Sequence, residues 1–315
     1  MTERNQYNIH VVVADSSVLY CDYLIENFRH TATRKENLKF YCYALDHESH
    51  QRFASAPAVV ESFPVYRDIA AYRRETWRDW KVFLQAQIGR QPMLGGSNGH
   101  SAGLNAIMQK TRSLPGHHII ADSDVAIITH GWDDKIEVLF EQFHLIGTTY
   151  EGKNGFSSGT SEVQTYKNFP NANWLAVRED CDLADLDWFP RKERHILIDD
   201  ADKSQLYGLP IGYQMVCDVG WRLPSFCRER GYFAKSMRHV KPSSPDCRVI
   251  LTAQDYNEEY QLDGVPFVAH QRGGSRHVFR EAEVSVGFYD CVEKAVGVPL
   301  ADKVREPQES EILAY

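Results

Sequence analysis

Long apolar runs are missing from this sequence. The chain has 315 residues, and no stretch approaches the roughly 20 mainly apolar residues that a membrane-spanning helix needs. The N-terminal stretch carries charge and then only a short apolar run, which does not fit a signal peptide. We therefore expect a chain without a transmembrane segment.

Cysteine is scarce, and its spacing shows no pairing. The seven cysteines are an odd number, lie far apart and lack the spacing of a metal site or a disulfide framework. This pattern is typical of reduced thiols in a cytosolic protein, so we expect a cytoplasmic location.

An excess of basic charge is also absent. The chain has 35 Lys and Arg residues against 43 Asp and Glu residues, a net charge of −8. This balance argues against a general polyanion binder, and we expect no nucleic-acid partner, although a local basic pocket for a phosphate stays compatible with it. Hydrophobic residues make up 43% and charged residues 25% of the chain, which is ordinary for a globular protein.

Short apolar runs indicate strands of a parallel sheet. Residues 9–14 form a short run rich in β-branched residues, with continuous instead of alternating hydrophobicity, which is typical of a strand covered on both faces. A second strand is expected at residues 38–45. Ser17 can cap a helix between them. A strand–helix–strand opening places both strand ends at one edge of a parallel sheet.

A third strand is predicted at residues 118–121, after a Gly-rich turn and a helix with apolar residues at helical spacing. This strand would carry Asp122, Ser123 and Asp124 to its C-terminal end, where open α/β sheets bind ligands. Further strands are expected at residues 145–149, 174–177, 195–198 and 248–251, and further helices at residues 65–90 and 218–230, the latter ended by Gly231.

The acidic pair Asp122 and Asp124 fits a divalent cation. Oxygen ligands suit Mg²⁺ or Mn²⁺, which proteins commonly bind through one or two carboxylates completed by substrate phosphates. A nucleotide diphosphate is therefore the natural third party. An isolated Asp-x-Asp triplet is weak evidence by itself, because most such triplets are solvated loop residues.

The segment HSAGLNAIMQKTRSLPGHHIIADSDVAIITHGW, residues 100–132, resembles the core of family-2-like glycosyltransferases with the GT-A fold. In that family a helix with a Leu-Asn pair leads to a strand that ends in Asp-x-Asp, and a Gly-Trp element follows. The resemblance implies that Asp122 and Asp124 bind the metal, that Asp122 and Ser123 contact the nucleotide ribose or diphosphate, and that Asn105 faces the donor.

A second segment, CDVGWRLPSFCRERGY at residues 217–232, resembles the family's Glu-Asp element at the start of a helix. By this resemblance Asp218 is the carboxylate that takes the proton of the acceptor hydroxyl. The sequence departs from the pattern at Cys217, where the family often has Glu, and at Gly220, where a second acid is common. The alternative for Asp218 is an ordinary helix cap.

A third segment, PFVAHQRGGSRHVFR at residues 266–280, contains a histidine that resembles the late metal ligand of many GT-A enzymes. By this resemblance His270 completes the metal shell, with His277 as a substitute. Arg272 or Arg276 can pair with a phosphate beside the Gly-Gly turn. The alternative for His270 is a buried structural histidine.

The nucleotide itself is expected at the ends of the first two strands. Ala14, Asp15 and Ser16 resemble the family's first nucleotide-contacting loop, and Asp46 resembles the acid that often meets the base or ribose. All of these residues could equally serve only to form turns, which Asp and Ser favour. Trp174, Trp188 and Trp221 are candidates for stacking on an acceptor sugar.

The sequence thus predicts an α/β protein with a central mixed, mostly parallel sheet flanked by helices, the GT-A fold. We expect one domain over residues 1–300, with a nucleotide-sugar-binding half over about residues 1–132, an acceptor-binding half over residues 133–300, and a charged tail at residues 301–315.

The predicted function is a Mn²⁺- or Mg²⁺-dependent glycosyltransferase of polysaccharide biosynthesis. It would move a hexose or pentose from a nucleotide sugar, with a UDP-sugar expected, to a glycan or glycolipid hydroxyl with inversion. One alternative is a sugar-nucleotide nucleotidyltransferase, although residues 14–23 lack the Gly-rich basic loop that it usually needs. The other is a non-catalytic sugar-binding module on the same fold.

Overall fold

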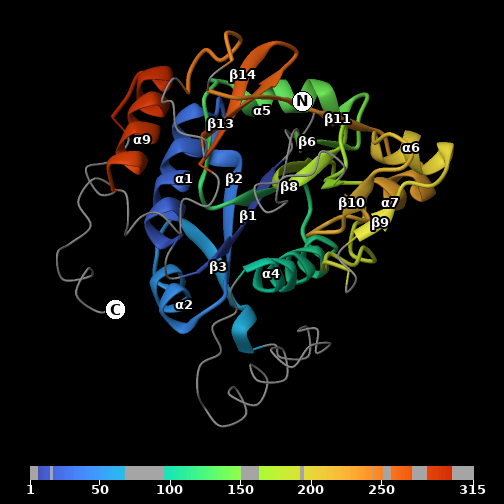
Figure 1. Ribbon diagram of the computed structural model, residues 1–315. Coiled ribbons are helices and arrows are strands. Elements are labelled where there is room, and N and C mark those ends of the chain that lie inside the picture. The colour runs from blue at the N-terminus through green and yellow to red at the C-terminus, as the bar shows by residue number, and fades with distance from the viewer. Residues whose placement is uncertain are drawn as a thin grey trace.

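The computed structural model describes most of the chain (Figure 1). The described residues are 6–14, 17–67, 96–149, 163–191, 195–242, 244–250, 257–271 and 282–299. Several predictions fall outside these ranges: the nucleotide contacts of Asp15 and Ser16, the phosphate contacts of Arg272 or Arg276, the substitute His277, most of the helix at residues 65–90, and the tail at residues 301–315.

A seven-stranded mixed sheet forms the centre of the molecule. The strands β1 to β4 are parallel to one another: β1 pairs with β2 and β4, and β2 pairs with β3. Strand β11 is parallel to β6, and β8 is antiparallel to both β4 and β6. The predicted α/β class with a mostly parallel central sheet is therefore confirmed. The spatial order is β11 (Ala234–Ser236), β6 (Leu145–Thr149), β8 (Pro170–Val177), β4 (His117–Asp122), β1 (Tyr7–Val13), β2 (Leu38–Ala44) and β3 (Val59–Pro64).

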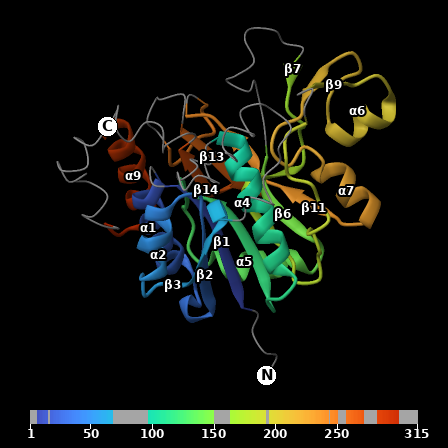
Figure 2. The same ribbon diagram turned by 90° about the horizontal axis from the view of Figure 1, so that it is seen from below.

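Helices cover both faces of this sheet, which explains the continuous apolar runs in its strands (Figure 2). On one face, α1 (Val18–Thr31) and α5 (Trp132–Phe140) share an apolar core with β1 and with every second residue of β4. On the other face, α4 (Gly96–Thr111) and α7 (Leu223–Arg230) contribute to an apolar cluster that also contains Tyr41, Tyr43 and Ile120. The helix α2 (His47–Ala54) connects β2 to β3.

Helix α1 begins where the sequence predicts, but not by the predicted capping bond. Ser17 occupies the N-cap position without a side-chain capping hydrogen bond. Its Oγ lies 2.9 Å from the carbonyl oxygen of Ala14, to which it donates, and it accepts from the Ala14 N–H at 3.0 Å. The hydroxyl therefore closes the turn after β1 and does not satisfy the first turn of the helix.

A second, four-stranded sheet lies beside the central one, and the sequence did not predict it. Its strands, in spatial order, are β12 (Arg238–Val240), β13 (Asn257–Leu262), β14 (Val265–Gln271) and β5 (Val125–Ile127), with every neighbouring pair antiparallel. Strand β5 follows β4 after only Ser123 and Asp124. The acidic triplet is therefore the link between the two sheets.

The remaining elements form a smaller module and a C-terminal helix. A three-stranded sheet has the order β7 (Val163–Gln164), β10 (Gln214–Val216) and β9 (His195–Leu197). The other elements are α6 (Ala201–Tyr207), α9 (Ala282–Val296) and the 3-10 turns η2 (Lys35–Asn37) and η3 (Val65–Arg67). Among the described helices, none combines the length and the apolar character that crossing a membrane requires.

The strands predicted at residues 145–149, 174–177 and 195–198 are confirmed as β6, β8 and β9. The strand predicted at residues 248–251 is wrong over residues 248–250, the part of it that the structure describes. The N–H groups of Arg248, Val249 and Ile250 donate to the carboxylate of Glu259 and not to a neighbouring strand. The buried carboxylate thus holds an apolar segment in an irregular loop.

A histidine pair lies inside the central sheet. His10 Nε2 of β1 lies 3.0 Å from His118 Nδ1 of β4, and His10 Nδ1 lies 3.1 Å from the hydroxyl of Tyr43. Burial, followed by the neighbouring His117, lowers the pKa of His118 from 6.5 to about 4. Burial, His118 and Lys110 lower the pKa of His10 as well. Both rings are therefore neutral in the folded protein at neutral pH.

We predict that acid destabilises the fold through this pair. Because the folded pKa of His118 is depressed, the unfolded chain binds more protons between its own pKa of 6.5 and the folded pKa, and stability falls as the pH drops through that window. From about pH 7.5 to about pH 5, His118 should contribute a loss of about 2 kcal/mol in the free energy of unfolding. Urea denaturation at both pH values measures this loss. His118→Gln should weaken the pH dependence; an unchanged slope would contradict the assignment.

Candidate metal centre

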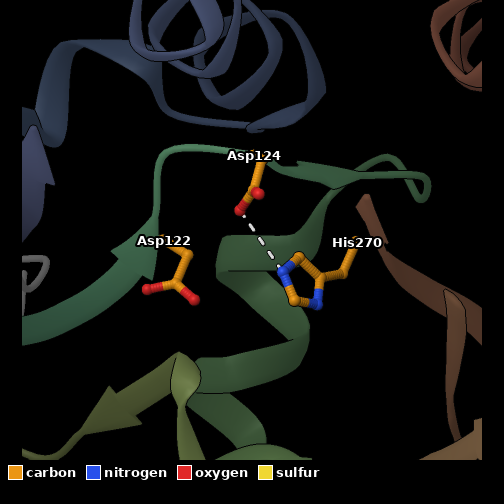
Figure 3. A group of neighbouring side chains, drawn as sticks. All are labelled: Asp122, Asp124 and His270. Carbon is orange, nitrogen blue, oxygen red and sulfur yellow. Dashed lines mark ion pairs between the residues drawn. The ribbon is translucent and has the colours of Figure 1, made fainter. Parts of the chain in front are cut away.

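Three side chains of types that can bind a metal ion converge beyond the C-terminal end of β4. Asp122 ends the strand, Asp124 lies in the turn to β5, and His270 lies near the end of β14. One ligand atom from each residue lies within 4.8 Å of the others. Figure 3 shows the carboxylate of Asp124 pointing at the ring of His270, while Asp122 lies at the end of the strand that leads to Asp124.

Strand pairing brings these distant residues together. In the antiparallel pair of β5 and β14, His270 is the partner of Val125, which directly follows Asp124. The N–H of Gln271 donates to the carbonyl oxygen of Asp124 at 3.0 Å, which extends the ladder into the acidic turn. The position of His270 therefore depends on the register of the second sheet.

The three side chains fit a divalent cation in chemistry and in spacing. Two carboxylates and an imidazole suit Mn²⁺ or Mg²⁺ when phosphate or water oxygens complete the shell. Ligands about 2.1 Å from such an ion lie about 3 Å apart when adjacent and about 4.2 Å apart when opposite. The observed separations of at most 4.8 Å need only small side-chain shifts to close on an ion.

His270 is held between two carboxylates. Its Nε2 lies 3.3 Å from Asp124 Oδ1, and its Nδ1 lies 3.1 Å from Glu258 Oε2. Burial alone lowers the pKa of His270, but Asp124 and then Glu258 outweigh burial and raise the pKa to about 10. Without a metal, the ring is a cation that neutralises the buried acids. Both readings of this residue, ligand and hydrogen-bonded structural histidine, are compatible with this geometry.

His100 is a fourth member of the cluster that sequence reasoning missed. It lies in the first half of α4, and its Nε2 is 3.1 Å from Asp122 Oδ1. Burial lowers the pKa of His100, but Asp122, followed by Asp218 and Asp124, together outweigh burial and raise the pKa. His100 therefore lies in the field of all three acids. Its position at the start of the glycosyltransferase-like segment was the available signal.

Close packing of α4 on β1 positions His100. A Cβ atom on Gly103 would lie only 2.6 Å and 2.7 Å from the two methyl carbons of Val12. Val12 is in turn the register partner of Asp122 in the β1–β4 pair. The absence of a side chain at position 103 thus lets α4 approach the strand ends closely enough for His100 to reach Asp122.

Asp218 lies between β10 and α7, partly buried. Helix α7 starts at Leu223 with Arg222 as its N-cap, and not at Asp218. The alternative interpretation of Asp218 as a helix cap is therefore wrong. The predicted end at Gly231 is confirmed, because Gly231 has a left-handed backbone at the C-cap.

A shared carbonyl ties the Asp218 loop to α4. The backbone oxygen of Trp188 accepts from Ser101 Oγ of α4 at 3.1 Å and from the N–H of Gly220 at 3.1 Å. Gly220 has φ +72° and lies against the Trp188 ring, so a side chain there would be strained and crowded. The loop after β10 and the helix that carries His100 therefore share one anchor.

The other predicted site residues lie around this edge, and their roles stay predictions. Asn105 is partly buried on α4, and Ser123 is buried in the β4–β5 turn. Ala14 follows β1 and is closed into its turn by Ser17. The carboxylate of Asp46 caps α2 by accepting from the Ser49 N–H at 2.8 Å.

The three candidate tryptophans differ in burial. Trp174 and Trp188 are each 0% exposed and belong to the apolar cores, so the suggestion that either stacks on a sugar is wrong. Trp221 is partly buried and follows the Asp218 loop, where its N–H donates to the carbonyl oxygen of Asp218 at 3.1 Å. It is the remaining stacking candidate of the three.

No protein-family model matches the sequence, and no curated protein matches it either. The solved structures to which the chain is similar include glycosyltransferases, as the sequence resemblance predicted. The mannosyltransferase PcManGT from Pyrobaculum calidifontis, in complex with GDP-Man and Mn²⁺, is 12% identical over 97% of this chain and 68% of that chain, with a TM-score of 0.37.

Two further similar structures come from bacteria. A putative nucleotide-diphospho-sugar transferase from Desulfovibrio desulfuricans G20 is 9% identical over 74% of this chain and 79% of that chain, with a TM-score of 0.36. The glycosyltransferase GlyE from Streptococcus pneumoniae TIGR4 is 12% identical over 74% of this chain, with a TM-score of 0.32, and the chain spans only 45% of GlyE. Likenesses this remote carry no argument about substrate or mechanism, which must come from the site itself.

We predict that Gly103→Ala lowers the free energy of unfolding as long as Val12 is present. Alanine favours a helix over glycine by about 1 kcal/mol, but the new Cβ would collide with a stiff β-branched side chain, at a cost of about 1–3 kcal/mol. Urea denaturation should show lower stability for Gly103→Ala in the natural background. In a Val12→Ala background, which removes both colliding methyl carbons, the same change should be neutral or stabilising. Stabilisation in both backgrounds would contradict the close approach.

Proposed function

We propose that this protein is a metal-dependent glycosyltransferase that moves a sugar from a nucleotide sugar to a hydroxyl of a glycan or glycolipid acceptor, with inversion. The observation that carries the proposal is the convergence of Asp122, Asp124 and His270 beyond the C-terminal end of β4. This is the edge of an open α/β sheet where ligands bind. We expect a UDP-sugar as the donor and Mn²⁺ or Mg²⁺ as the cation.

The acidic pair and His270 are suited to hold the diphosphate end of the donor. A bound divalent cation would neutralise charge on the diphosphate as the sugar bond breaks, which stabilises the leaving group. Asp122 and Asp124 provide oxygen ligands on both sides of a short turn. His270 adds a nitrogen ligand from the buried end of β14, and its contact with Glu258 keeps the ring in place.

His100 is placed to act on the same diphosphate from α4. Its side chain is 26% exposed, and Asp122, Asp218 and Asp124 raise its pKa, so it carries a proton more readily than an ordinary histidine. A charged imidazole beside Asp122 can donate a hydrogen bond to a phosphate oxygen that approaches the acidic pair. We propose this donor contact for His100.

Asp218 is the proposed base. The charges of Asp218 and Asp122 both act on His100, which supports a location for Asp218 close to the donor end of the site. A carboxylate there can take the acceptor hydroxyl's proton while the sugar–diphosphate bond breaks on the opposite side, and that geometry inverts the anomeric centre. The anchor at the Trp188 carbonyl would keep the Asp218 loop fixed relative to α4. Trp221 can offer an apolar ring to the acceptor sugar from the same loop.

The proposed location, biological role and nucleotide contacts rest on the sequence pattern. A cytoplasmic location and a role in polysaccharide biosynthesis are expectations of the cysteine pattern and the family resemblance. Binding of the nucleotide by Ala14, Asp15, Ser16 and Asp46, and of a phosphate by Arg276, belongs to the same set. The donor nucleotide is best decided by comparing UDP-sugars with GDP-sugars directly.

We predict that Asp218→Asn abolishes transfer but spares donor binding. Removing a general base should lower kcat by about 10²–10⁴-fold, because the acceptor hydroxyl then has no proton acceptor. Donor binding should persist, because Asp218 is not among the metal-binding side chains. The measurement pairs nucleotide release from a panel of UDP- and GDP-sugars in Mn²⁺ with a thermal-shift assay of donor binding.

Asp202→Asn, which removes an exposed carboxylate of α6, is the matched control and should leave transfer unchanged. Loss of donor binding by Asp218→Asn would defeat the base role. A natural protein that binds these donors but never cleaves or transfers them would instead be a sugar-nucleotide-binding module, and the transferase proposal would fail.

A further inference from the structure

A second carboxylate lies behind the candidate metal centre. Glu258 of β13 is the cross-strand partner of His270 of β14, and its side chain is 9% exposed. Its Oε2 lies 3.1 Å from Nδ1 of His270, on the side of the ring opposite Asp124. The buried acid therefore contacts the proposed ligand at the nitrogen that does not face the metal.

Glu258 is itself fixed by neighbours in the same sheet. The hydroxyl of Tyr260 donates to Oε2 at 2.7 Å, and His239 Nε2 of β12 lies 3.5 Å from Oε1. Three adjacent strands thus contribute to one buried arrangement: β12 through His239, β13 through Glu258 and Tyr260, and β14 through His270. A carboxylate held in this way has little freedom to turn away from the imidazole.

This geometry has a consequence for metal binding. An imidazole offers a lone pair to a metal at one nitrogen only when its proton sits on the other nitrogen. A carboxylate at Nδ1 keeps the proton there, fixes the plane of the ring and makes Nε2 a better ligand. Nε2 is the atom that faces Asp124.

We propose that Glu258 is a positioning residue that sets the tautomer and the orientation of His270 for a divalent cation. The proposal rests on the proposed metal centre and adds a residue that does not touch the metal. Tyr260 supports Glu258 in this role through its hydrogen bond. The pair therefore controls affinity for the cation and, through it, the donor diphosphate.

The test measures Mn²⁺ binding to the metal-free protein by titration calorimetry, without donor, acceptor or turnover. Glu258→Gln, which keeps the shape but weakens the acceptor at Nδ1, should lower Mn²⁺ affinity by about 10–100-fold. Tyr260→Phe should give a smaller loss in the same direction. Glu259→Gln is the matched control, because Glu259 is an adjacent buried carboxylate that contacts residues 247–250 and Gln261. Its Mn²⁺ affinity should be unchanged.

A second readout separates positioning from general damage. At a Mg²⁺ concentration that saturates the natural protein, ¹⁵N NMR of the His270 ring should show a metal-bound Nε2 with the proton on Nδ1, and Glu258→Gln should lose the metal-bound Nε2 signal at the same concentration. Thermal unfolding in a chelator reports whether each variant is folded, and Tyr260→Phe carries the test if Glu258→Gln does not fold.

The outcomes distinguish the two proposals. Natural protein that binds Mn²⁺, together with full affinity in Glu258→Gln and Tyr260→Phe, would overturn the role of Glu258 and leave the metal centre standing. An equal loss in Glu259→Gln would overturn it as well, since the effect would then be unspecific. Failure of the natural protein to bind Mn²⁺ would overturn the metal centre and with it both proposals.

Discussion

Buried negative charge is the constraint around which the C-terminal edge of the central sheet is arranged. Asp124 is 8% exposed and Asp122 lies beside it, and carboxylates taken out of water are costly unless a positive group or a metal pairs with them. Without a metal, His270 pairs with Asp124 and His100 pairs with Asp122. The imidazoles thus supply the positive charge that a cation supplies in the proposed active state. A site that is neutralised by exchangeable protons is ready to exchange them for a metal.

Topology gives this charge cluster its rigidity. The chain leaves the central sheet at Asp122, turns through Asp124 and enters the second sheet as β5. The cluster therefore lies at a junction of two hydrogen-bonded sheets, and α4 closes it from the side through the contact of Gly103 with Val12. Backbone hydrogen bonds on both sides limit the movement of each member. Such preorganisation is what electrostatic stabilisation of a leaving diphosphate requires.

The sequence was informative where a local pattern carried the signal. Continuous apolar runs located β1, β2, β4, β6 and β8, because strands buried on both faces need apolar residues on both faces. Because Asp122 and Asp124 directly follow the apolar run of β4, they could be placed at the C-terminal edge of the central sheet. His270 was found by resemblance, and the structure brings it to the acids through the pairing of β5 with β14.

Contacts that depend on distant segments could not be found in this way. Glu258 belongs to a strand whose apolar and polar residues follow no simple alternation, since its neighbouring acid, Glu259, is buried against a loop of backbone N–H groups. His100 points to Asp122 only because α4 crosses β1 closely. The burial of Trp188 and the late start of α7 also arise from tertiary packing.

The proposed activity requires that one divalent cation binds Asp122, Asp124 and His270 together. Anomalous diffraction from crystals soaked with Mn²⁺ and a nucleoside diphosphate can locate this ion. We expect one manganese peak about 2.1–2.2 Å from an oxygen of each carboxylate and from Nε2 of His270, with phosphate oxygens completing the shell. A peak elsewhere, or no peak while the three side chains keep their metal-free hydrogen bonds, would contradict it.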